Sequence, residues 1–245
     1  MIGIISPAMN MRMGKTPDIR LSRPVMMEKA ERIYEELKKL QPWEIQSLMK
    51  TNEKIALQAF LDFQDWKKEG GTAAVFAYDG LVFKNVDAGH MTPEELEYLN
   101  RHVRILSGLY GVLRPLDEIR PYRLEMASPI KIDGQNLYRF WGDSLAGEIF
   151  TPGEPVINLA SEEYAKAVRK YADPFDRWID IEFLTMRNGK LKTIVAWAKM
   201  ARGQMIRFIA QRRPEDPEEL KAFEFHGYEY EEALSAENKF VFISR

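Results

Sequence analysis

The chain has 245 residues, of which 45% are apolar and 29% are charged, the balance of an ordinary globular protein. This composition excludes a wholly disordered or fibrous chain, because enough apolar side chains are present to build a core. The formal net charge is -2, so any attraction to polyanions must come from local clusters of Lys and Arg. The length suits one domain, and we expect residues 1–245 to form it.

The residue inventory argues against thiol, metal and membrane chemistry. Cysteine is absent, which excludes disulfide scaffolds, thiol nucleophiles and thiolate metal sites. The histidines, His90, His102 and His226, lie far apart, and we expect no metal and no cofactor. Residues 1–14 hold only a short apolar start before Pro7, too short for a signal peptide or a membrane span. We therefore expect a cytoplasmic protein that contacts no membrane.

The first part of the chain predicts a short strand followed mainly by helices. Ile2–Ile5 is a β-branched run that ends before Pro7, the pattern of a buried strand leaving its sheet at a turn. Helical apolar spacing extends over residues 24–40 and then, as one or two further helices, over residues 42–63. Residues 72–83 carry two β-rich runs around an Asp-Gly pair, which predicts a β-hairpin.

The best-marked helix begins at Thr92. Thr92 is a good cap, Pro93 suits the first helical position, and Glu95 completes a capping box three residues after the cap. Apolar side chains then recur at helical spacing. We expect the helix to span residues 92–106 and to end at Gly108.

The second part of the chain alternates irregularly between strands and helices. The expected elements are a helix at 137–150, a strand at 156–159, a helix capped by Ser161, a helix at 198–212 and a strand at 240–243. Two alternating runs, 177–185 and 190–197, are joined by Asn188-Gly189 and predict an antiparallel hairpin with a type I′ turn. This order favours a single mixed α+β domain with a central, largely antiparallel or mixed sheet and surrounding helices.

Two adjacent segments near the end of the chain carry opposite charge. Residues 187–213 contain eight Lys or Arg and no acid, whereas residues 214–237 contain nine acids and one Lys. One interpretation is that the two segments face one another and cancel, or that both are solvated faces. The other is that the basic segment forms an anion-binding surface.

Arg202 is the residue that favours anion binding. On the predicted helix it falls within an arc of apolar side chains, where a cation needs a partner. Lys199 and Arg202 also occupy the first turns of that helix, where the helix dipole disfavours positive charge and backbone amides are free. A bound phosphate, or an internal Asp or Glu, would resolve this conflict.

A second basic cluster, within residues 99–123, surrounds a pair of glycines. In this cluster five arginines outnumber two acids. The run Leu-Ser-Gly-Leu-Tyr-Gly-Val at residues 106–112 places Gly108 and Gly111 three apart, directly after the predicted helix. This matches the hairpin of a helix-hairpin-helix, whose backbone N–H groups bind phosphate. Gly108 also fits a simple helix C-cap.

Five segments, in order through nearly the whole chain, carry a family resemblance. They are ISPA at residues 5–8, LSGLYGVLRPLDEIRPYRLEM at 106–126, YRFWGD at 138–143, NLASEEY at 158–164 and ARGQMIRFI at 201–209. Together these segments resemble the YaaA family of bacterial peroxide-stress proteins. The long central segment is the most specific of them.

The resemblance implies a single mixed α+β domain with a helix-hairpin-helix-like element beside a basic cleft. It implies binding to duplex or branched DNA, without sequence specificity, and a role in limiting peroxide damage linked to intracellular iron. The chain departs from the family pattern in two places. Met9 stands where the family usually has Lys, and the segment after Gly80 lacks part of its usual ending.

Two functions remain open from the sequence. The first is DNA binding through phosphate contacts, for which the expected residues are Arg104, Gly108, Tyr110, Gly111, Arg114, Lys199, Arg202 and Arg207. The alternative is an enzyme that acts on a nucleotide or another phosphorylated small molecule, with the polar cleft candidates Ser6, Asp143 and Ser161. No residue spacing identifies a catalytic group, and Asp143 and Ser161 also fit a turn cap and a helix N-cap. We expect DNA, or a phosphorylated small molecule, as the partner of a monomer.

Overall fold

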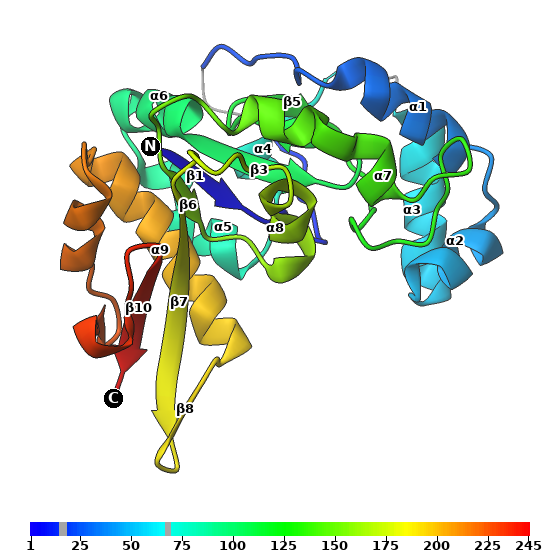
Figure 1. Ribbon diagram of the computed structural model, residues 1–245. Helices are drawn as coiled ribbons and strands as arrows, with labels where there is room; N and C mark the ends of the chain where they lie inside the picture. Colours follow the sequence, from blue (N-terminus) through cyan, green and yellow to red (C-terminus); the bar gives the residue numbers. More distant parts are fainter. Residues whose placement is uncertain (15–18, 67–69) are drawn as a thin grey trace.

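A computed structural model of the protein describes residues 1–14, 19–66 and 70–245. In these residues the main sheet has eight strands (Figure 1). From one edge to the other they are β4 (Gly111–Leu113), β3 (Val103–Ser107), β1 (Ile2–Ile5), β6 (Val156–Asn158), β7 (Trp178–Arg187), β10 (Lys239–Ser244) and β9 (Tyr228–Tyr230), with β8 (Lys190–Lys192) paired to β7. A separate small ladder joins β2 (Thr72–Ala73) to β5 (Glu118–Ile119).

The centre of the main sheet is parallel, and its antiparallel pairs lie at the margins. Ile4 of β1 lies opposite Arg104 of β3 and Asn158 of β6, and β7 continues this parallel arrangement between β6 and β10. The pairs β3–β4, β9–β10 and β7–β8 are antiparallel. The mixed α and β class is confirmed. Of the two sheet types expected, largely antiparallel or mixed, the mixed sheet is confirmed. Its centre is parallel because long helical crossovers, rather than tight turns, connect the central strands.

The helices surround this sheet and differ widely in length. In chain order the described ones are α1 (Met27–Leu37), α2 (Pro42–Met49), α3 (Glu53–Asp65), α4 (Ala74–Ala77), α5 (Leu81–Val86), α6 (Pro93–His102), α7 (Leu137–Trp141), α8 (Glu162–Arg169) and α9 (Val195–Arg212). Short 3-10 segments are η1 (Ala88–His90), η2 (Gly142–Glu148), η3 (Pro217–Ala222) and η4 (Glu232–Leu234). None of the described helices has the length and apolar composition that crossing a bilayer requires.

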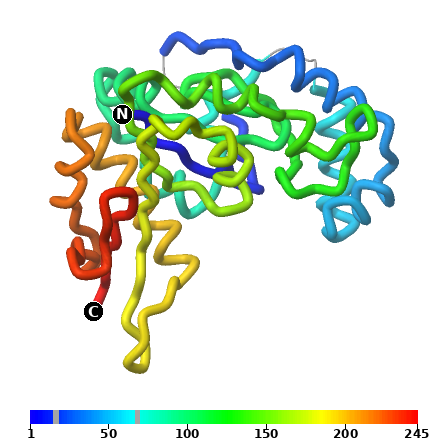
Figure 2. Tube along the Cα trace, in the orientation of Figure 1, coloured from blue at the N-terminus to red at the C-terminus, as the bar shows by residue number. Residues whose placement is uncertain are grey.

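The trace in Figure 2 shows how the parts are arranged around β1. Helices α1 to α3 gather at one end of the molecule, and the β7–β8 hairpin projects at another (Figures 1 and 2). Strand β1 lies in the middle of the sheet and is fully buried, which explains why its apolar run does not alternate with polar residues. The main sheet holds strands from both ends of the chain, which is compatible with the predicted single domain.

Helix α9 lies against α5, and this contact overturns the hairpin predicted for residues 72–83. Instead of pairing with each other, residues 74–77 and 81–86 are helical, and the short strand β2 pairs with β5. Gly203 of α9 allows the approach, because a Cβ at this position would overlap the carbonyl oxygen of Val82. Packing between segments far apart in sequence therefore outweighs the local Asp-Gly turn signal.

The helix predicted at residues 92–106 begins as expected and ends early. The capping box is confirmed, since the Thr92 hydroxyl accepts from the N–H of Glu95 and the Glu95 carboxylate accepts from the N–H of Thr92. The helix ends at His102, and residues 103–107 enter the sheet as β3, parallel to β1. β-Branched residues in this run gain more from burial between strands than from a longer helix.

Other elements follow the predicted order with shifted boundaries. The helix expected at 137–150 divides at Gly142, whose φ of 57° ends α7 and starts η2. The β7–β8 hairpin is confirmed, with Asn188 and Gly189 both at positive φ as a type I′ turn requires. Helix α9 begins at Val195, three residues before the predicted start.

Candidate functional site

A pocket lies outside the carboxyl ends of the neighbouring parallel strands β1 and β6. Ser6 directly follows β1, Ser161 lies shortly after β6, and both line the pocket, whose volume is about 380 Å³. From β1 the chain passes to β3 on one side, and later it returns to β6 on the other side, so the strand order reverses here. In open α/β sheets this reversal is where ligands bind, because the loops diverge and leave a crevice.

Segments from five parts of the chain line the pocket. They are residues 6–10, residues 79–83 at the start of α5, residues 122–125, several residues of the 159–164 turn, and Lys199 with Arg202 on α9. The structure therefore brings together four residues that the sequence analysis treated as separate candidates: Ser6, Ser161, Lys199 and Arg202. It adds Met9, Tyr122 and Arg123. Each had a weaker signal in the sequence: Met9 departs from the family pattern, Tyr122 lies in the resembling segment 106–126, and Arg123 also belongs to the basic cluster within residues 99–123.

The two serines link the loops after β1 and β6. The Ser6 hydroxyl accepts a hydrogen bond from the Ser161 backbone N–H at 2.8 Å, and the two Oγ atoms are 3.1 Å apart. Ser161 is the N-cap residue of α8, as predicted, but its side chain makes no capping hydrogen bond. The two hydroxyls are thus directed toward each other at the pocket wall. A ligand in the pocket can replace either of them as the hydrogen-bond partner of the other.

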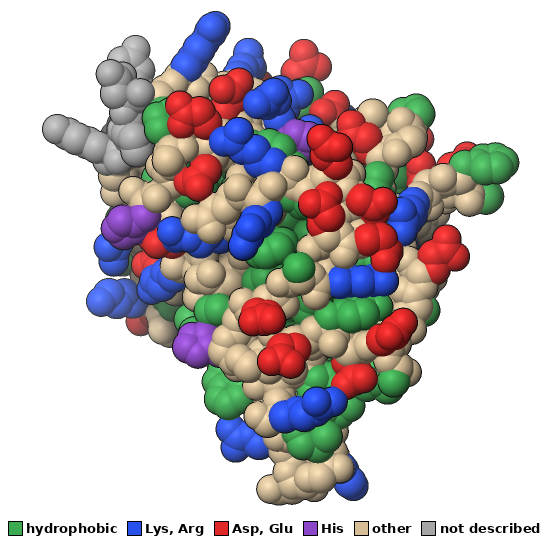
Figure 3. Space-filling model, turned by 90° about the vertical axis from the view of Figure 1, so that its left-hand side faces the viewer, with side chains coloured by type: hydrophobic (Ala, Val, Ile, Leu, Met, Phe, Trp, Pro, Cys, Tyr) green, Lys and Arg blue, Asp and Glu red, His purple; other side chains and the backbone are tan. Residues whose placement is uncertain are grey.

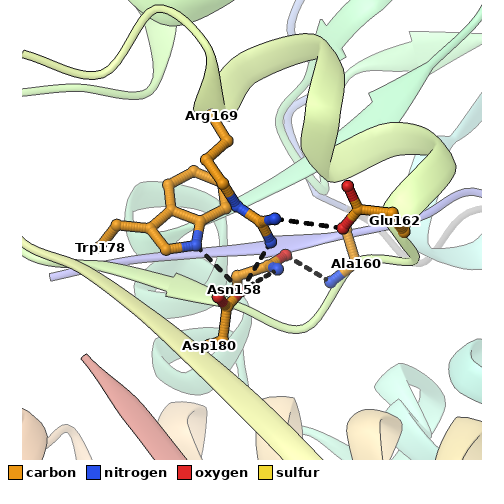
Figure 4. Close-up of polar contacts among 6 residues, drawn as sticks. All are labelled: Asn158, Ala160, Glu162, Arg169, Trp178 and Asp180. Atoms are coloured by element: carbon orange, nitrogen blue, oxygen red, sulfur yellow. Dashed lines mark hydrogen bonds and ion pairs between the residues drawn. The ribbon is translucent and has the colours of Figure 1, made fainter. Parts of the chain in front are cut away.

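A polar network fixes the turn that carries Ser161 (Figure 4). One carboxylate oxygen of Asp180 accepts from the side-chain amide of Asn158 at 2.7 Å and from Arg169 at 2.8 Å. The same oxygen accepts from the indole N–H of Trp178 at 2.9 Å. The Asn158 side chain also accepts from the N–H of Ala160 at 3.0 Å. The network attaches α8 and the preceding turn to β6 and β7, so the serine pair has a rigid support.

Arg202 is a half-buried cation without a partner among the described residues. Within residues 1–14, 19–66 and 70–245, no carboxylate pairs with it, and its Nε atom is buried with no acceptor. Burial alone lowers the pKa of the Arg202 guanidinium. The internal Asp or Glu that the sequence analysis offered as a partner for Arg202 is therefore not found among the described residues. A charge removed from water is unfavourable when unpaired, so an anion bound at this position would be stabilised.

Two more cations line the same pocket. Lys199 is exposed and lies one helical turn before Arg202 on α9. Arg123 contacts Met9 twice: Nη1 donates to the Met9 carbonyl at 3.4 Å, and Nη2 is 4.0 Å from the sulfur. The Nε atom of Arg123 is buried and, like that of Arg202, has no partner among the described residues. Because α9 begins at Val195, Lys199 and Arg202 lie beyond its first turn. The helix dipole therefore does not strongly disfavour their positive charges, which act on the pocket as local charges.

Carboxylates also reach the pocket, in the side chains of Asp79, Glu125 and Glu163. Asp79 pairs with Lys84 at 2.9 Å, and the hydrogen bond from this lysine lowers the pKa of the Asp79 carboxyl. The Glu163 carboxylate accepts from the N–H of Ala127 at 3.0 Å. The pocket thus offers cations for an anionic group and carboxylate oxygens for hydroxyl or amino groups.

Comparison with known proteins agrees with the resemblance seen in the motifs. The family described as peroxide stress protein YaaA matches residues 1–234. The chain belongs to this family. A UPF0246 protein of Agathobacter rectalis is 37% identical over 241 residues, which cover 98% of this chain and 97% of the relative. A UPF0246 protein of Clostridioides difficile is 37% identical over 245 residues, with 99% of each chain covered. A UPF0246 protein of Marinomonas sp. is 39% identical over 251 residues, which cover 98% of this chain and 95% of the relative.

Four other candidates of this YaaA-family chain lie outside the pocket. Arg207 is on α9 but pairs with Asp87 at 2.5 Å. Arg104 donates to main-chain carbonyls around the end of α6, the shortest contact being 2.9 Å, and to the carbonyl of Glu148 at the end of η2. Arg114 is exposed beyond β4, and Asp143 is exposed in the first turn of η2. None of these four residues lines the pocket outside the ends of β1 and β6. We call this pocket the switch-point pocket below.

The glycine run at residues 106–112 is a β-hairpin between β3 and β4, so the expected helix-hairpin-helix is wrong. The two amides that follow Gly108 donate to the Ser107 hydroxyl at 3.2 and 3.0 Å and are buried. A Cβ on Gly108 would lie 2.7 Å from the carbonyl oxygen of Leu124. Gly111 is buried too, at a φ of 73°. The glycines of this YaaA motif therefore serve close packing, and these amides are not available to a phosphate.

A buried cluster of tyrosines lies behind the hairpin. Tyr110 accepts from the indole N–H of Trp66 at 3.1 Å and from a backbone amide at 3.0 Å. The Tyr122 hydroxyl is 2.7 Å from that of Ser107 and 2.6 Å from that of Tyr78. Burial raises the pKa of Tyr122 to about 12 and also raises the pKa of Tyr110. Tyr110, expected at a phosphate site, is instead part of the core.

The two oppositely charged segments do not neutralise each other through the ion pairs that the structure describes. Glu218 pairs with Arg177 and Lys221, and Glu231 pairs with Arg245, so the described pairs of the acidic segment lie outside residues 187–213. On the face shown in Figure 3, acidic and basic side chains are interspersed, with no continuous patch of one sign. The net charge of a segment therefore says little about its binding; the partners of each side chain decide.

Proposed function

We propose that this YaaA-family protein binds a phosphorylated small molecule, such as a nucleotide, in the switch-point pocket. The observation that carries the proposal is Arg202, a half-buried cation that lines the pocket and whose buried Nε atom has no partner in the described chain. A phosphate supplies both the missing charge and the missing acceptor, and charge-assisted hydrogen bonds of this kind are the strong ones.

The other groups of the pocket fit the same class of ligand. Lys199 adds a second cation on the same helix, and the Ser6 and Ser161 hydroxyls add neutral donors at the strand ends. Glu125 supplies a carboxylate of the kind that accepts hydrogen bonds from ribose hydroxyls in other α/β folds. The volume of about 380 Å³ is within the range of small-molecule sites, about 300–1,000 Å³.

The geometry favours a small molecule over a DNA duplex. Sequence-independent duplex binding depends on several exposed phosphate contacts. Of the residues expected for such contacts, Gly108, Tyr110 and Gly111 are buried. Arg104 and Arg207 are engaged inside the protein. A recessed arginine with a neighbouring lysine suits one terminal phosphate better than a continuous backbone.

Calorimetric titration of two arginine variants tests the proposal. The ligands are inorganic phosphate and a set of nucleoside monophosphates. Arg202→Ala should raise Kd at least about tenfold, a loss of about 1.4 kcal/mol. Arg207→Ala is the matched control, because it removes the same charge from the same helix at a position that pairs with Asp87 outside the pocket. Its Kd should stay within about twofold of the wild type.

Equal loss in both variants, or binding that survives Arg202→Ala, would contradict the proposal. A parallel titration with labelled duplex DNA at two salt concentrations covers the alternative. Binding that falls steeply with salt and is lost in Arg202→Ala would make a DNA phosphate the ligand. The effect on intracellular iron stays a prediction from the resemblance, and chelatable iron in cells that carry wild type or Arg202→Ala after peroxide exposure would measure it.

A further inference from the structure

Met9 is an exposed methionine at the switch-point pocket. It lies in the loop that follows β1, lines the pocket, and has 46% of its surface exposed. Its carbonyl oxygen and its sulfur both contact the guanidinium of Arg123, at 3.4 and 4.0 Å. A chemical change at this sulfur is therefore made next to one of the cations that line the pocket.

Arg123 is held weakly where it stands. Its Nε atom is buried without a partner among the described residues, and the contacts of its two terminal nitrogens are with Met9. The sulfur that it contacts is a thioether, which is a weak hydrogen-bond acceptor. A stronger acceptor in the same place would compete for the guanidinium, which is otherwise available to an anion in the pocket.

We propose that Met9 is a site of reversible oxidation by hydrogen peroxide, and that the sulfoxide oxygen binds Arg123 and withdraws it from the pocket. In this step a sulfur lone pair attacks one peroxide oxygen, the S–O bond forms as the O–O bond breaks, and the other oxygen leaves as water after proton transfer. Sulfur is oxidised by two electrons and the peroxide is reduced. Methionine sulfoxide reductases reverse the change. The effect on the ligand rests on the proposed function of the pocket.

Other methionines provide internal comparisons. Met186 on β7 is 41% exposed, close to the value for Met9, but it lines a different pocket beside Trp197. Met11 is less exposed than Met9, and its sulfur accepts from the N–H of Tyr122 at 3.4 Å. Met186 is thus matched to Met9 in exposure and differs from it in contact with Arg123.

Binding of inorganic phosphate before and after treatment with limited peroxide tests the inference. Peptide mass spectrometry measures oxidation at Met9 and Met186 in the same samples. In wild type and in Met186→Leu, oxidation should weaken phosphate binding several-fold, and a methionine sulfoxide reductase should restore it. In Met9→Leu the same treatment should leave the affinity unchanged. Loss of affinity in Met9→Leu, or no loss in wild type with Met9 oxidised, overturns the inference.

A second readout does not depend on ligand binding. The Nε–H signal of Arg123 in a nitrogen-15 NMR spectrum, assigned with Arg123→Lys, should shift when wild type is oxidised and should stay in place in Met9→Leu. If untreated wild type binds neither phosphate nor nucleotides, the proposed function fails, and this signal alone decides the methionine inference. A signal that does not respond to oxidation of Met9 overturns the inference, and so does Met9 that stays unoxidised under peroxide treatment that oxidises Met186.

Discussion

The glycine hairpin at residues 106–112 and the switch-point pocket both look like phosphate sites in the sequence, yet the structure separates them. In the hairpin, the amides that would bind phosphate already donate to Ser107. Gly108 is packed against the backbone of Leu124 and Glu125, and Gly111 against the side chains of Met26 and Trp141. In the pocket, Arg202 has no partner in the described chain, and cations and hydroxyls converge on a crevice. Buried polar groups are normally paired, so an exception indicates a ligand more reliably than a motif does.

Two half-buried arginines, Arg104 and Arg202, make the same distinction within one residue type. Burial lowers the pKa of Arg104 and of Arg202 alike. The Arg104 guanidinium, however, donates to main-chain carbonyls at 2.9 and 3.0 Å, which makes it a structural group around the end of α6. Burial of a cation is therefore not sufficient to identify a binding site. A buried cation whose donors have acceptors inside the protein has a structural role, whereas one whose donors lack acceptors is a candidate for ligand binding.

The largest expected effect lies in the hairpin. Gly108→Val places side-chain atoms against the Leu124 carbonyl and the Glu125 backbone, which cannot move aside as a side chain can. We expect the free energy of unfolding in urea to fall by about 3 kcal/mol or more. Gly147→Ala is the control, since a Cβ there meets nothing within 4 Å, and its change should be within about 0.5 kcal/mol. A Gly108→Val protein that keeps its stability and loses only ligand binding would mean that the glycine hairpin is a binding site rather than a packing element.

The two half-buried arginines should respond in opposite directions to substitution by methionine. Arg104→Met removes hydrogen bonds to the backbone and should lower the free energy of unfolding by about 2 kcal/mol. Arg202→Met removes a half-buried charge that has no partner in the described chain and should raise this free energy by about 1 kcal/mol, while it abolishes phosphate binding. Denaturant titration of both variants without ligand measures the difference. Destabilisation by both would mean that Arg202 is a packing residue.

The smallest expected effect concerns Tyr122, which lines the pocket and also contacts Ser107 of the hairpin. Its pKa is about 12 in the folded protein, above the ordinary value of 10.0, so the folded state favours the neutral phenol. The stabilisation that the raised pKa gives to the folded protein is fully present below pH 10 and is lost as pH rises from 10 to about 12. Tyr122→Phe should lower the free energy of unfolding by about 1 kcal/mol at pH 8 through lost hydrogen bonds.

The difference between Tyr122→Phe and wild type should then narrow at alkaline pH, because the phenylalanine cannot ionise. Urea unfolding at pH 8, 10 and 11 measures this trend. A difference that stays constant across these pH values would contradict the raised pKa of Tyr122, and with it the view that the cluster behind the hairpin is sealed from solvent.

Local patterns determined the elements whose signals lie within a few residues. The capping box at Thr92 and the Asn188-Gly189 turn were predicted because each depends on neighbouring dihedral angles and short-range hydrogen bonds. The apolar arc around Arg202 was predicted for the same reason, since helical spacing alone places these side chains on one face. The family resemblance, which covers most of the chain, also needs only the order of residues.

Tertiary structure decided what the local patterns left open. Residues 103–107 become a strand because β1, far away in sequence, offers a parallel partner. Residues 81–86 become a helix that packs against α9 rather than a strand. The sheet order brings Ser6 and Ser161 together, and the packing of α9 against α5 places Arg202 at the same pocket, without a partner among the described residues. Such partnerships depend on contacts between distant segments, whose free energy is not contained in any short stretch of the chain.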